Sequence, residues 1–209
     1  MELSGRRADG RVLRGTRNRA AIVDALFALV GRGQLEPTAQ QVAAAAGVGI
    51  RSVFRHFTEM DGLHRAMDAR LAADAAHLLA TPRTTGSFDV RLRALVRQRA
   101  ALFEHVAPYK RAANLQRWRS AFLQGRHRRL QRLLRDELHA WLPEVARAPA
   151  PIVEAIDVIA SLEAWERLRR DRGLDVAAAS AVVTRAVRAL LGPRAGAARR
   201  RRSRSPRYG

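Results

Sequence analysis

Residues 38–57, TAQQVAAAAGVGIRSVFRHF, contain two short helix patterns separated by a glycine, and this arrangement constrains the fold more than any other feature. Thr38 and Gln41 have the spacing of a capping box, in which each side chain accepts a hydrogen bond from a free backbone amide of the first turn. Gly47 supplies the left-handed residue that ends a helix. A second helix is predicted from about Gly49, after a short turn.

The second helix has an apolar side and a polar side. Its apolar residues fall within an arc of about 100° when each position advances 100°; they are Ile50, Val53, Phe54 and Phe57. The small side chain of Ala43 allows the first helix to pack closely. This is the layout of a helix-turn-helix, whose second helix enters the major groove of DNA. The alternative is an ordinary surface helix, since any such helix has a polar face.

The remaining sequence also repeats apolar residues at three and four positions, without the sustained alternation typical of strands. We therefore predict an all-α fold. Thr58 with Asp61 is expected to start one helix, Pro108 and Pro143 to end two others, and Asp175 to cap the last. The predicted helices span about 17–30, 38–46, 49–57, 58–78, 88–106, 109–117, 120–142, 151–171 and 175–191.

The formal net charge of +20 is unevenly distributed along the chain. Residues 1–80 hold 11 basic and 8 acidic residues, a net of +3, whereas residues 81–209 hold 28 and 11, a net of +17. The segment 105–135 has no acidic residue. Such a field attracts polyanions, so nucleic acid is the first expected partner and an anionic membrane surface the second.

Several classes of protein are excluded or disfavoured. Cysteine is absent, which excludes disulfides and thiolate metal or redox sites. The chain has no run of 18 apolar residues and no apolar signal region at its start, so we expect no membrane span and a cytoplasmic location. It contains no HExxH motif, glycine-rich phosphate loop, Ser/His/Asp arrangement or plausible pair of carboxylates. We therefore predict that it is not an enzyme and has no cofactor or metal.

Residues 17–67 resemble the N-terminal domain of the TetR family of bacterial transcriptional repressors. The resemblance lies in a helix ending near Gly31, followed by PTAQQVAAAAGVGIRSVFRHFTEMDGL. The matching positions are Thr38, Ala43, Gly47, Val48, Phe54, His56, Phe57 and Leu63. Beyond residue 67 the chain is similar to the family only in its length and helical architecture.

The resemblance implies a homodimer that binds a near-palindromic double-stranded DNA operator and releases it when a small-molecule effector binds. It implies a helix-turn-helix DNA-binding domain over residues 16–66 and an effector-binding and dimerisation domain over 67–193. Composition adds a flexible basic arm over 1–15 and a disordered arginine-rich tail over 194–209.

The family pattern also implies which residues contact DNA. Ile50, Arg51 and Ser52 are expected to face base edges, where an arginine commonly binds guanine O6 and N7. Thr38 and His56 are expected to bind phosphates. The full predicted set is Thr38, Gly49, Ile50, Arg51, Ser52, Phe54, Arg55 and His56.

Three positions depart from the family pattern. The family usually has Ser or Thr where Gly49 stands, Tyr where Phe54 stands and Lys where Met60 stands. The last two differences remove two phosphate contacts, which predicts weaker binding and a flatter salt dependence.

The second domain is expected to supply the dimer interface and the effector pocket. The helices at 151–171 and 175–191 carry enough apolar residues to pack on a second copy, and the alternative is the core of a single-chain bundle. The basic run over 110–135 is expected to be a solvated face, or else to favour an anionic effector. The predicted effector contacts are His105, Tyr109, Asn114, Trp118, His127 and Asp157.

Two other functions remain open on the sequence. The arginine-rich segments also fit a non-specific architectural protein that coats DNA or RNA, or a protein that binds membrane surfaces. Specificity for a DNA sequence distinguishes these alternative functions from that of a repressor. A repressor protects one short palindrome, whereas a coating protein binds random duplex equally well.

Overall fold

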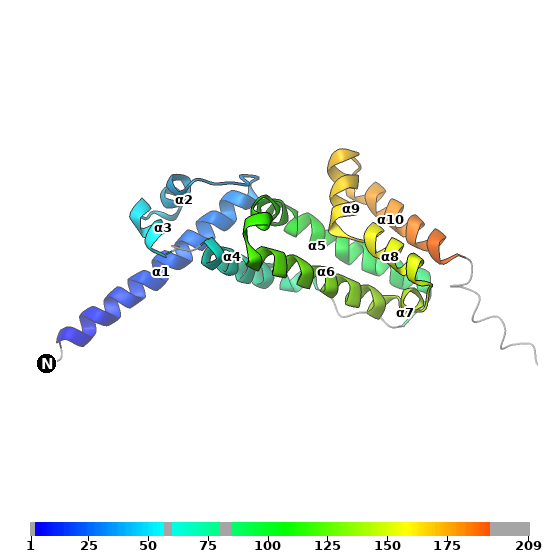
Figure 1. The fold of residues 1–209 in the computed structure, drawn as a ribbon, viewed down its shortest axis with the longest axis horizontal. Helices are drawn as coiled ribbons and strands as arrows, with labels where there is room; N and C mark the ends of the chain where they lie inside the picture. The colour runs from blue at the N-terminus through cyan, green and yellow to red at the C-terminus, as the bar shows by residue number, and fades with distance from the viewer. Residues whose placement is uncertain (1–2, 57–59, 80–84, 193–209) are drawn as a thin grey trace, which may run out of the picture. The chain divides into compact units, whose positions relative to one another are not determined.

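The computed structural model describes residues 3–56, 60–79 and 85–192, and all of their regular structure is helical (Figure 1). The predicted all-α fold is therefore confirmed. The described residues divide into two compact units. Unit 1 takes those up to residue 76 and those from 106 to 127, and unit 2 takes the remainder. The predicted DNA-binding segment, 16–66, lies wholly within unit 1.

Unit 1 is built around a long first helix. Helix α1 contacts α2, α3 and α4, and α2 contacts α3. The end of α5 and the start of α6 complete the unit. These elements are α1 (Leu3–Gly31), α2 (Ala39–Ala46), α3 (Ile50–His56), α4 (Met60–Ala75), α5 (Phe88–Gln116), the 3-10 turn η2 (Arg117–Arg119) and α6 (Ala121–Trp141).

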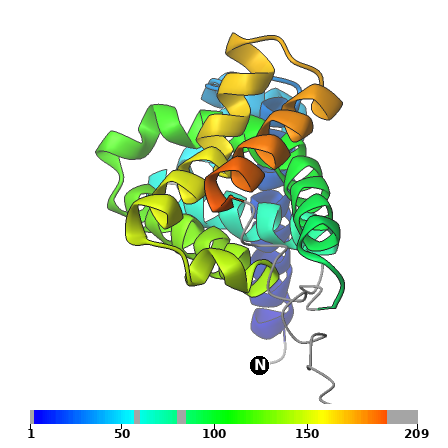
Figure 2. The same ribbon diagram turned by 90° about the vertical axis from the view of Figure 1, so that its right-hand side faces the viewer.

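Unit 2 contains the rest of α5 and α6 and the C-terminal helices. Helix α8 lies beside α10 and also contacts the short helices α7 and α9 (Figures 1 and 2). The further elements are η1 (Ala76–Leu78), α7 (Pro143–Ala146), α8 (Ala150–Ile159), α9 (Leu162–Glu166), the π-helical turn η3 (Arg167–Asp171) and α10 (Val176–Leu191). No helix among the described residues has the length and apolarity needed to cross a membrane.

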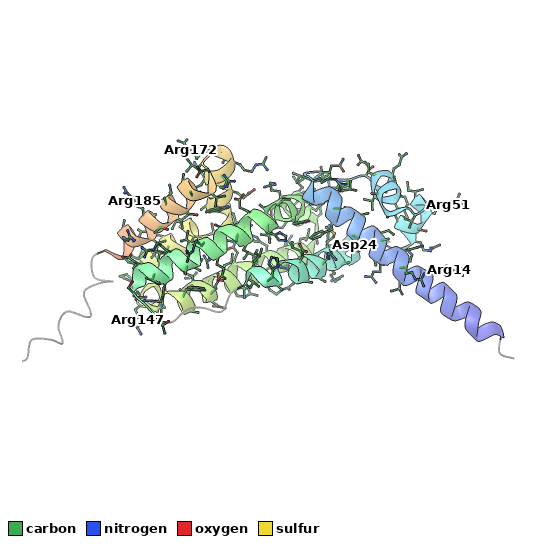
Figure 3. All side chains as sticks on the ribbon, turned by 180° about the vertical axis from the view of Figure 1, so that it is seen from behind. Arg14, Asp24, Arg51, Arg147, Arg172 and Arg185 are labelled. Carbon is green, nitrogen blue, oxygen red and sulfur yellow. The ribbon has the colours of Figure 1, made fainter. Side chains whose placement is uncertain are left out.

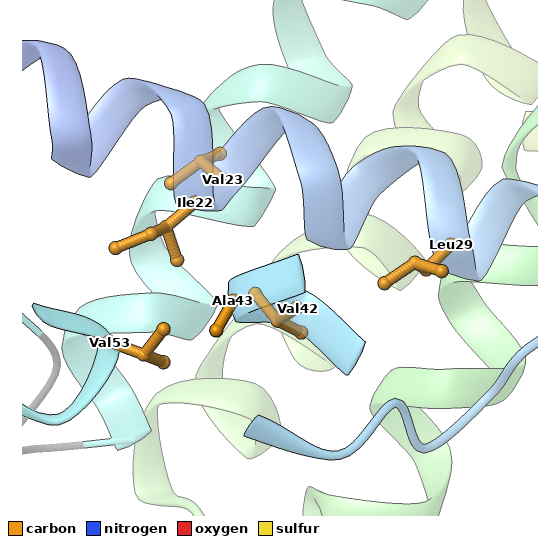
Figure 4. Packing of buried hydrophobic residues seen from close by; sticks show 6 residues of the cluster. All are labelled: Ile22, Val23, Leu29, Val42, Ala43 and Val53. Carbon is orange, nitrogen blue, oxygen red and sulfur yellow. The ribbon is translucent and has the colours of Figure 1, made fainter. Parts of the chain in front are cut away.

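The core of unit 1 is aliphatic and brings the first three helices together. Figure 4 shows Ile22 of α1, Ala43 of α2 and Val53 of α3 converging on one point. Ile22 has no exposed surface, and the other two are also buried. Burying such side chains stabilises a fold by about 1.5–3 kcal/mol each, so this cluster fixes α3 against α1 and α2.

The core of unit 2 encloses two arginines as well as aliphatic side chains. Arg99 donates hydrogen bonds to Glu137 Oε2 (3.1 Å), to the carbonyl of Ala160 (2.8 Å) and to the carbonyl of Leu134. Arg91 donates to the carbonyl of Trp141 (2.8 Å) and to Glu144. Buried charges persist only when they are paired in this way. The two arginines therefore tie α5 to α6, α7 and the end of α8.

Two predicted helix limits are wrong, one at the start of α1 and one within α5. Helix α1 begins at Leu3, so residues 3–15, expected as a flexible arm, are helical. A single glycine inside a helix costs only about 1 kcal/mol relative to alanine, and Gly5, Gly10 and Gly15 do not interrupt this one. Helix α5 also continues through Pro108, which was expected to end it. Packing on both sides supports it, since Val106 is buried and the Tyr109 ring stacks on Phe27 at 4.2 Å.

The helix predicted over 151–171 is interrupted instead of continuous. Helix α8 ends at Ile159, and Ser161 caps α9 by accepting a hydrogen bond from the Ala164 amide (3.2 Å). The Ala160 carbonyl is taken by Arg99, 61 positions away in sequence. No local pattern reveals such a partner.

Asp175 caps α10 as predicted, because its side chain accepts a hydrogen bond from the Ala178 amide at 2.7 Å. Phe57, the predicted cap Thr58 and the predicted tail over 194–209 lie outside the described residues.

Candidate nucleic-acid interface

The first helix of the predicted motif has both of its expected caps. Thr38 Oγ1 accepts from the Gln41 amide (3.2 Å), and Gln41 Oε1 accepts from the Thr38 amide (2.9 Å). This confirms the capping box. At the other end Gly47 adopts φ 64° and ψ 31°, the left-handed conformation that glycine reaches at little cost. The Val48 amide then donates to the Ala43 carbonyl (3.1 Å), which closes the turn before α3.

Helix α3 is held at one position and exposed at most others. Val53 is 8% exposed and packs on Ile22 and Ala43, whereas Ile50 and Phe54 are 45% and 60% exposed. The apolar arc predicted from the sequence is therefore buried at Val53 alone among the described residues. Arg51 is exposed and lies on the outer side of α3 (Figure 3). The helix thus presents exposed apolar and cationic side chains together.

The other predicted DNA contacts fall into three situations. Arg55 is exposed and donates to Ser52 Oγ (3.3 Å), so these two side chains are held together on α3. The position of Gly49 is open, because a Cβ built there meets no atom within 4 Å. His56 differs from the rest: its Nε2 is buried and has no hydrogen-bond partner among the described residues. Its ring lies close to α1, where a Cβ on Gly15 would stand 3.7 Å from His56 Cε1.

Three of the six predicted effector contacts come together, and three do not. Tyr109, Asn114 and His127 line one cavity of about 300 Å³ inside unit 1. Trp118 is also in unit 1 but is 68% exposed, with the Arg119 guanidinium 4.0 Å from its ring centroid. His105 and Asp157 belong to unit 2. The ring of His105 lies 6.4 Å from that of His77, and Asp157 lies 3.7 Å from Arg135.

Several other residues of the cavity wall had no predicted role in effector binding. Side chains of α1 and α3 form one wall, including Ile22, Val53 and Phe54. Helix α4 forms another with His64, Met67 and Leu71, which share a face at intervals of three and four. Their spacing is that of any amphipathic helix, so no local signal distinguishes a cavity wall from a filled core.

A polar network joins α4 to the start of α6 beside this cavity. The Ser120 hydroxyl donates to Asp61 Oδ1 (2.6 Å) and accepts from the Leu123 amide (3.1 Å). The Ser120 hydrogen bond, with smaller help from His64, lowers the pKa of Asp61 despite the opposing effect of desolvation. Burial lowers the pKa of His64, although nearby Asp61 acts in the opposite direction. His64 is therefore expected to be neutral at pH 7.

The predicted dimer helices each carry exposed valines. Val158 of α8 is 67% exposed, and Val176 and Val182 of α10 are 40% and 38% exposed. Other positions of these helices are buried, at Val153 and Ile156 in α8 and at Val183 in α10. Within the residues that the structure describes, no group of three or more His, Asp or Glu side chains is arranged to hold a metal ion.

Comparison with known proteins adds no assignment. No protein-family model matches the chain, and no curated protein matches it significantly.

Proposed function

We propose that the chain is a ligand-responsive transcriptional regulator of the TetR type, which binds a palindromic operator as a dimer in the cytoplasm. The observation that carries the proposal is the setting of α3. Its buried Val53 fixes the helix on α1 and α2, while exposed Arg51 and Ile50 face outward from it. A recognition helix needs this combination, because bases are read only by side chains held in a fixed register.

The caps of α2 support the same proposal. Thr38 stands at the start of α2, where free backbone amides and the helix dipole favour a phosphate. The capping box fixes this helix start, and the Gly47 turn fixes α3 after it. Arg51 is assigned to base reading, and Thr38 to positioning on the backbone. Arg55, held beside Ser52, extends the cationic surface of α3.

A dimer is proposed from the exposed apolar side chains of α8 and α10. Exposed valines on two adjacent helices favour burial against a partner. A second copy supplies a matching surface, because a two-fold interface uses the same patch on both subunits. Two copies of α3 then present themselves to the two halves of a palindrome.

A direct test begins by selecting bound duplexes from a random pool and comparing variants on the selected site. Arg51→Ala is expected to weaken binding to that site by about 1–3 kcal/mol and to relax the preference at a single base pair. Arg172→Ala removes the same charge from an exposed position in unit 2 and is the matched control. If Arg51→Ala weakens binding to the selected and random duplexes equally, the base-reading role is wrong.

A second candidate function, non-specific coating of nucleic acid, is favoured by one observation. The segment 105–135 has no acidic residue, and Arg128, Arg129 and Arg132 of α6 are exposed. A protein acting through such charges binds all duplexes alike, with an affinity that falls steeply as salt rises. Selection from the random pool then returns no common sequence.

A further inference from the structure

The cavity of unit 1 is partly open to solvent and extends to α3, the helix that is assigned to DNA contact. Its volume is about 300 Å³, and its walls come from α1 to α4 on one side and from residues 109–127 on the other. Val53 and Phe54 of α3 both line it. A ligand that fills the cavity therefore contacts α3.

The size and lining of the cavity indicate a small apolar molecule. Cavities of about 150 Å³ lined by aliphatic side chains bind benzene, so this one has room for about two rings. Most of the wall is aliphatic, and a void deprives such side chains of their dispersion contacts. A ligand that restores those contacts binds more favourably. The main aliphatic residues of the wall are Ile22, Leu26, Val30, Leu63, Met67 and Leu71.

The charged groups at the cavity favour an anion over a cation. Lys110, Arg117 and Arg126 contribute three positive charges, and Glu36 and Asp68 contribute two negative ones. Arg126 forms an ion pair with Asp68, and Glu36 accepts a hydrogen bond from Gln116 (2.9 Å). Counted over the lining residues alone, positive charges outnumber negative ones by one. Partly buried sites amplify such an imbalance, because charges are screened less there than in water.

His64 adds a polar group to the wall of the cavity. Its Nδ1 is buried and lies 3.6 Å from Asp61 Oδ1, beyond hydrogen-bonding distance. A buried polar atom without a partner is costly, and a ligand group can satisfy it. The Ser120 hydrogen bond to Asp61 joins α4, the helix that carries His64, to the start of α6.

We propose that this cavity binds a small monoanionic molecule with an apolar body about the size of two fused rings. Binding of this molecule lowers the affinity of α3 for DNA. The binding site rests on the cavity alone, whereas its effect on DNA rests on the proposed function. A ligand shifts the equilibrium between two positions of α3 only if it binds one arrangement of Val53 and Phe54 more tightly than the other.

The binding step is tested on the full-length protein with 1-naphthoate as the anionic probe and 1-naphthol as its neutral counterpart. The chain has three methionines, and Met67 lines the cavity. With ¹³C-methyl methionine NMR, 1-naphthoate is expected to shift the Met67 signal, which the Met67→Leu variant identifies.

Ala113→Leu narrows the cavity and should weaken 1-naphthoate binding at least tenfold, and Ala112→Leu is a second variant that narrows it. Ala101→Leu, at an exposed position of α5 outside the lining, is the matched control and should bind normally.

Two results overturn the binding site. One is an unshifted Met67 signal at saturating 1-naphthoate, and the other is binding that both narrowing variants retain. If 1-naphthol binds as tightly as 1-naphthoate, the preference for an anion is wrong.

The effect on DNA is measured separately, on the selected duplex. Saturating 1-naphthoate should weaken duplex binding by wild type at least tenfold and should not do so in Ala113→Leu. Unchanged duplex affinity in the ligand-bound wild type overturns the regulatory step while leaving the binding site. A wild-type protein that selects no duplex sequence but still binds 1-naphthoate overturns the proposed function and not the cavity.

Discussion

The two units differ in how their interiors are filled. Unit 1 has an aliphatic cluster on Ile22 beside a cavity of about 300 Å³, whereas a cavity beside Arg99 in unit 2 measures only about 10 Å³. Unit 2 also places Arg91 and Arg99 in its core. Arg91 is hydrogen-bonded to one backbone carbonyl and Glu144, and Arg99 to two backbone carbonyls and Glu137. Unit 1 keeps its ion pair Arg126–Asp68 at the cavity lining.

This difference indicates different roles for the units. Close packing with buried hydrogen-bonded charges specifies one arrangement, because any shift leaves polar groups without partners. A hollow aliphatic core resists rearrangement less, since its side chains have room to move. We therefore expect unit 1 to respond to a ligand and unit 2 to keep its shape.

The largest predicted effect concerns Arg99. Replacing it with methionine leaves Glu137 and two backbone carbonyls without their partner, so Arg99→Met should lower the free energy of unfolding by about 3 kcal/mol. Arg97→Met, at an exposed position of the same helix, should change it little. Urea denaturation followed by circular dichroism measures both. Equal effects of the two variants would show that Arg99 is not the tie between α5, α6 and α8.

A pair of small-to-large substitutions tests the contrast in packing directly. Ala179 of α10 has no exposed surface, so Ala179→Leu should overpack unit 2 and destabilise it by about 1–3 kcal/mol. Ala113→Leu fills part of the cavity in unit 1 and should stabilise the protein by about 0.5–2 kcal/mol. The same denaturation experiment reports both signs. If both variants destabilise the protein by similar amounts, the cavity of unit 1 has no room for a larger side chain at residue 113.

The smallest predicted effect concerns the capping box of unit 1. Thr38→Ala removes the acceptor for the Gln41 amide and should cost about 1 kcal/mol of stability. Gln40→Ala, exposed in the first turn of α2, is the matched control and should be near neutral. Thermal unfolding compares the two. A neutral Thr38→Ala would mean that water replaces the cap without loss.

Local sequence signals were sufficient to predict the caps of α2 and the turn that follows it. Thr38 with Gln41, and Gly47 after four alanines, act within one or two helical turns, so their geometry is visible in the sequence. Asp175 is a further local cap that was predicted correctly. These features depend on neighbours in the chain and not on the rest of the fold.

Features set by distant partners were not predictable from the sequence. Where α5 continues through Pro108, Val106 is buried and the Tyr109 ring stacks on Phe27. Where α8 ends after Ile159, the Ala160 carbonyl accepts a hydrogen bond from Arg99. Tyr109, Asn114 and His127, which are predicted effector contacts, line the cavity. The contribution of Val53 and Phe54 to the cavity was missed, because the sequence placed both on the apolar face of α3 and assigned Phe54 to DNA contact.

The central claim, that α3 reads a specific DNA sequence, is tested most directly by equilibrium titration of one fluorescent duplex against its shuffled counterpart. The duplex is the one selected from the random pool, and both titrations are run at the same salt concentration. We predict that the selected duplex binds at least about 10³-fold more tightly than the shuffled one. Equal affinities for the two duplexes would contradict the claim.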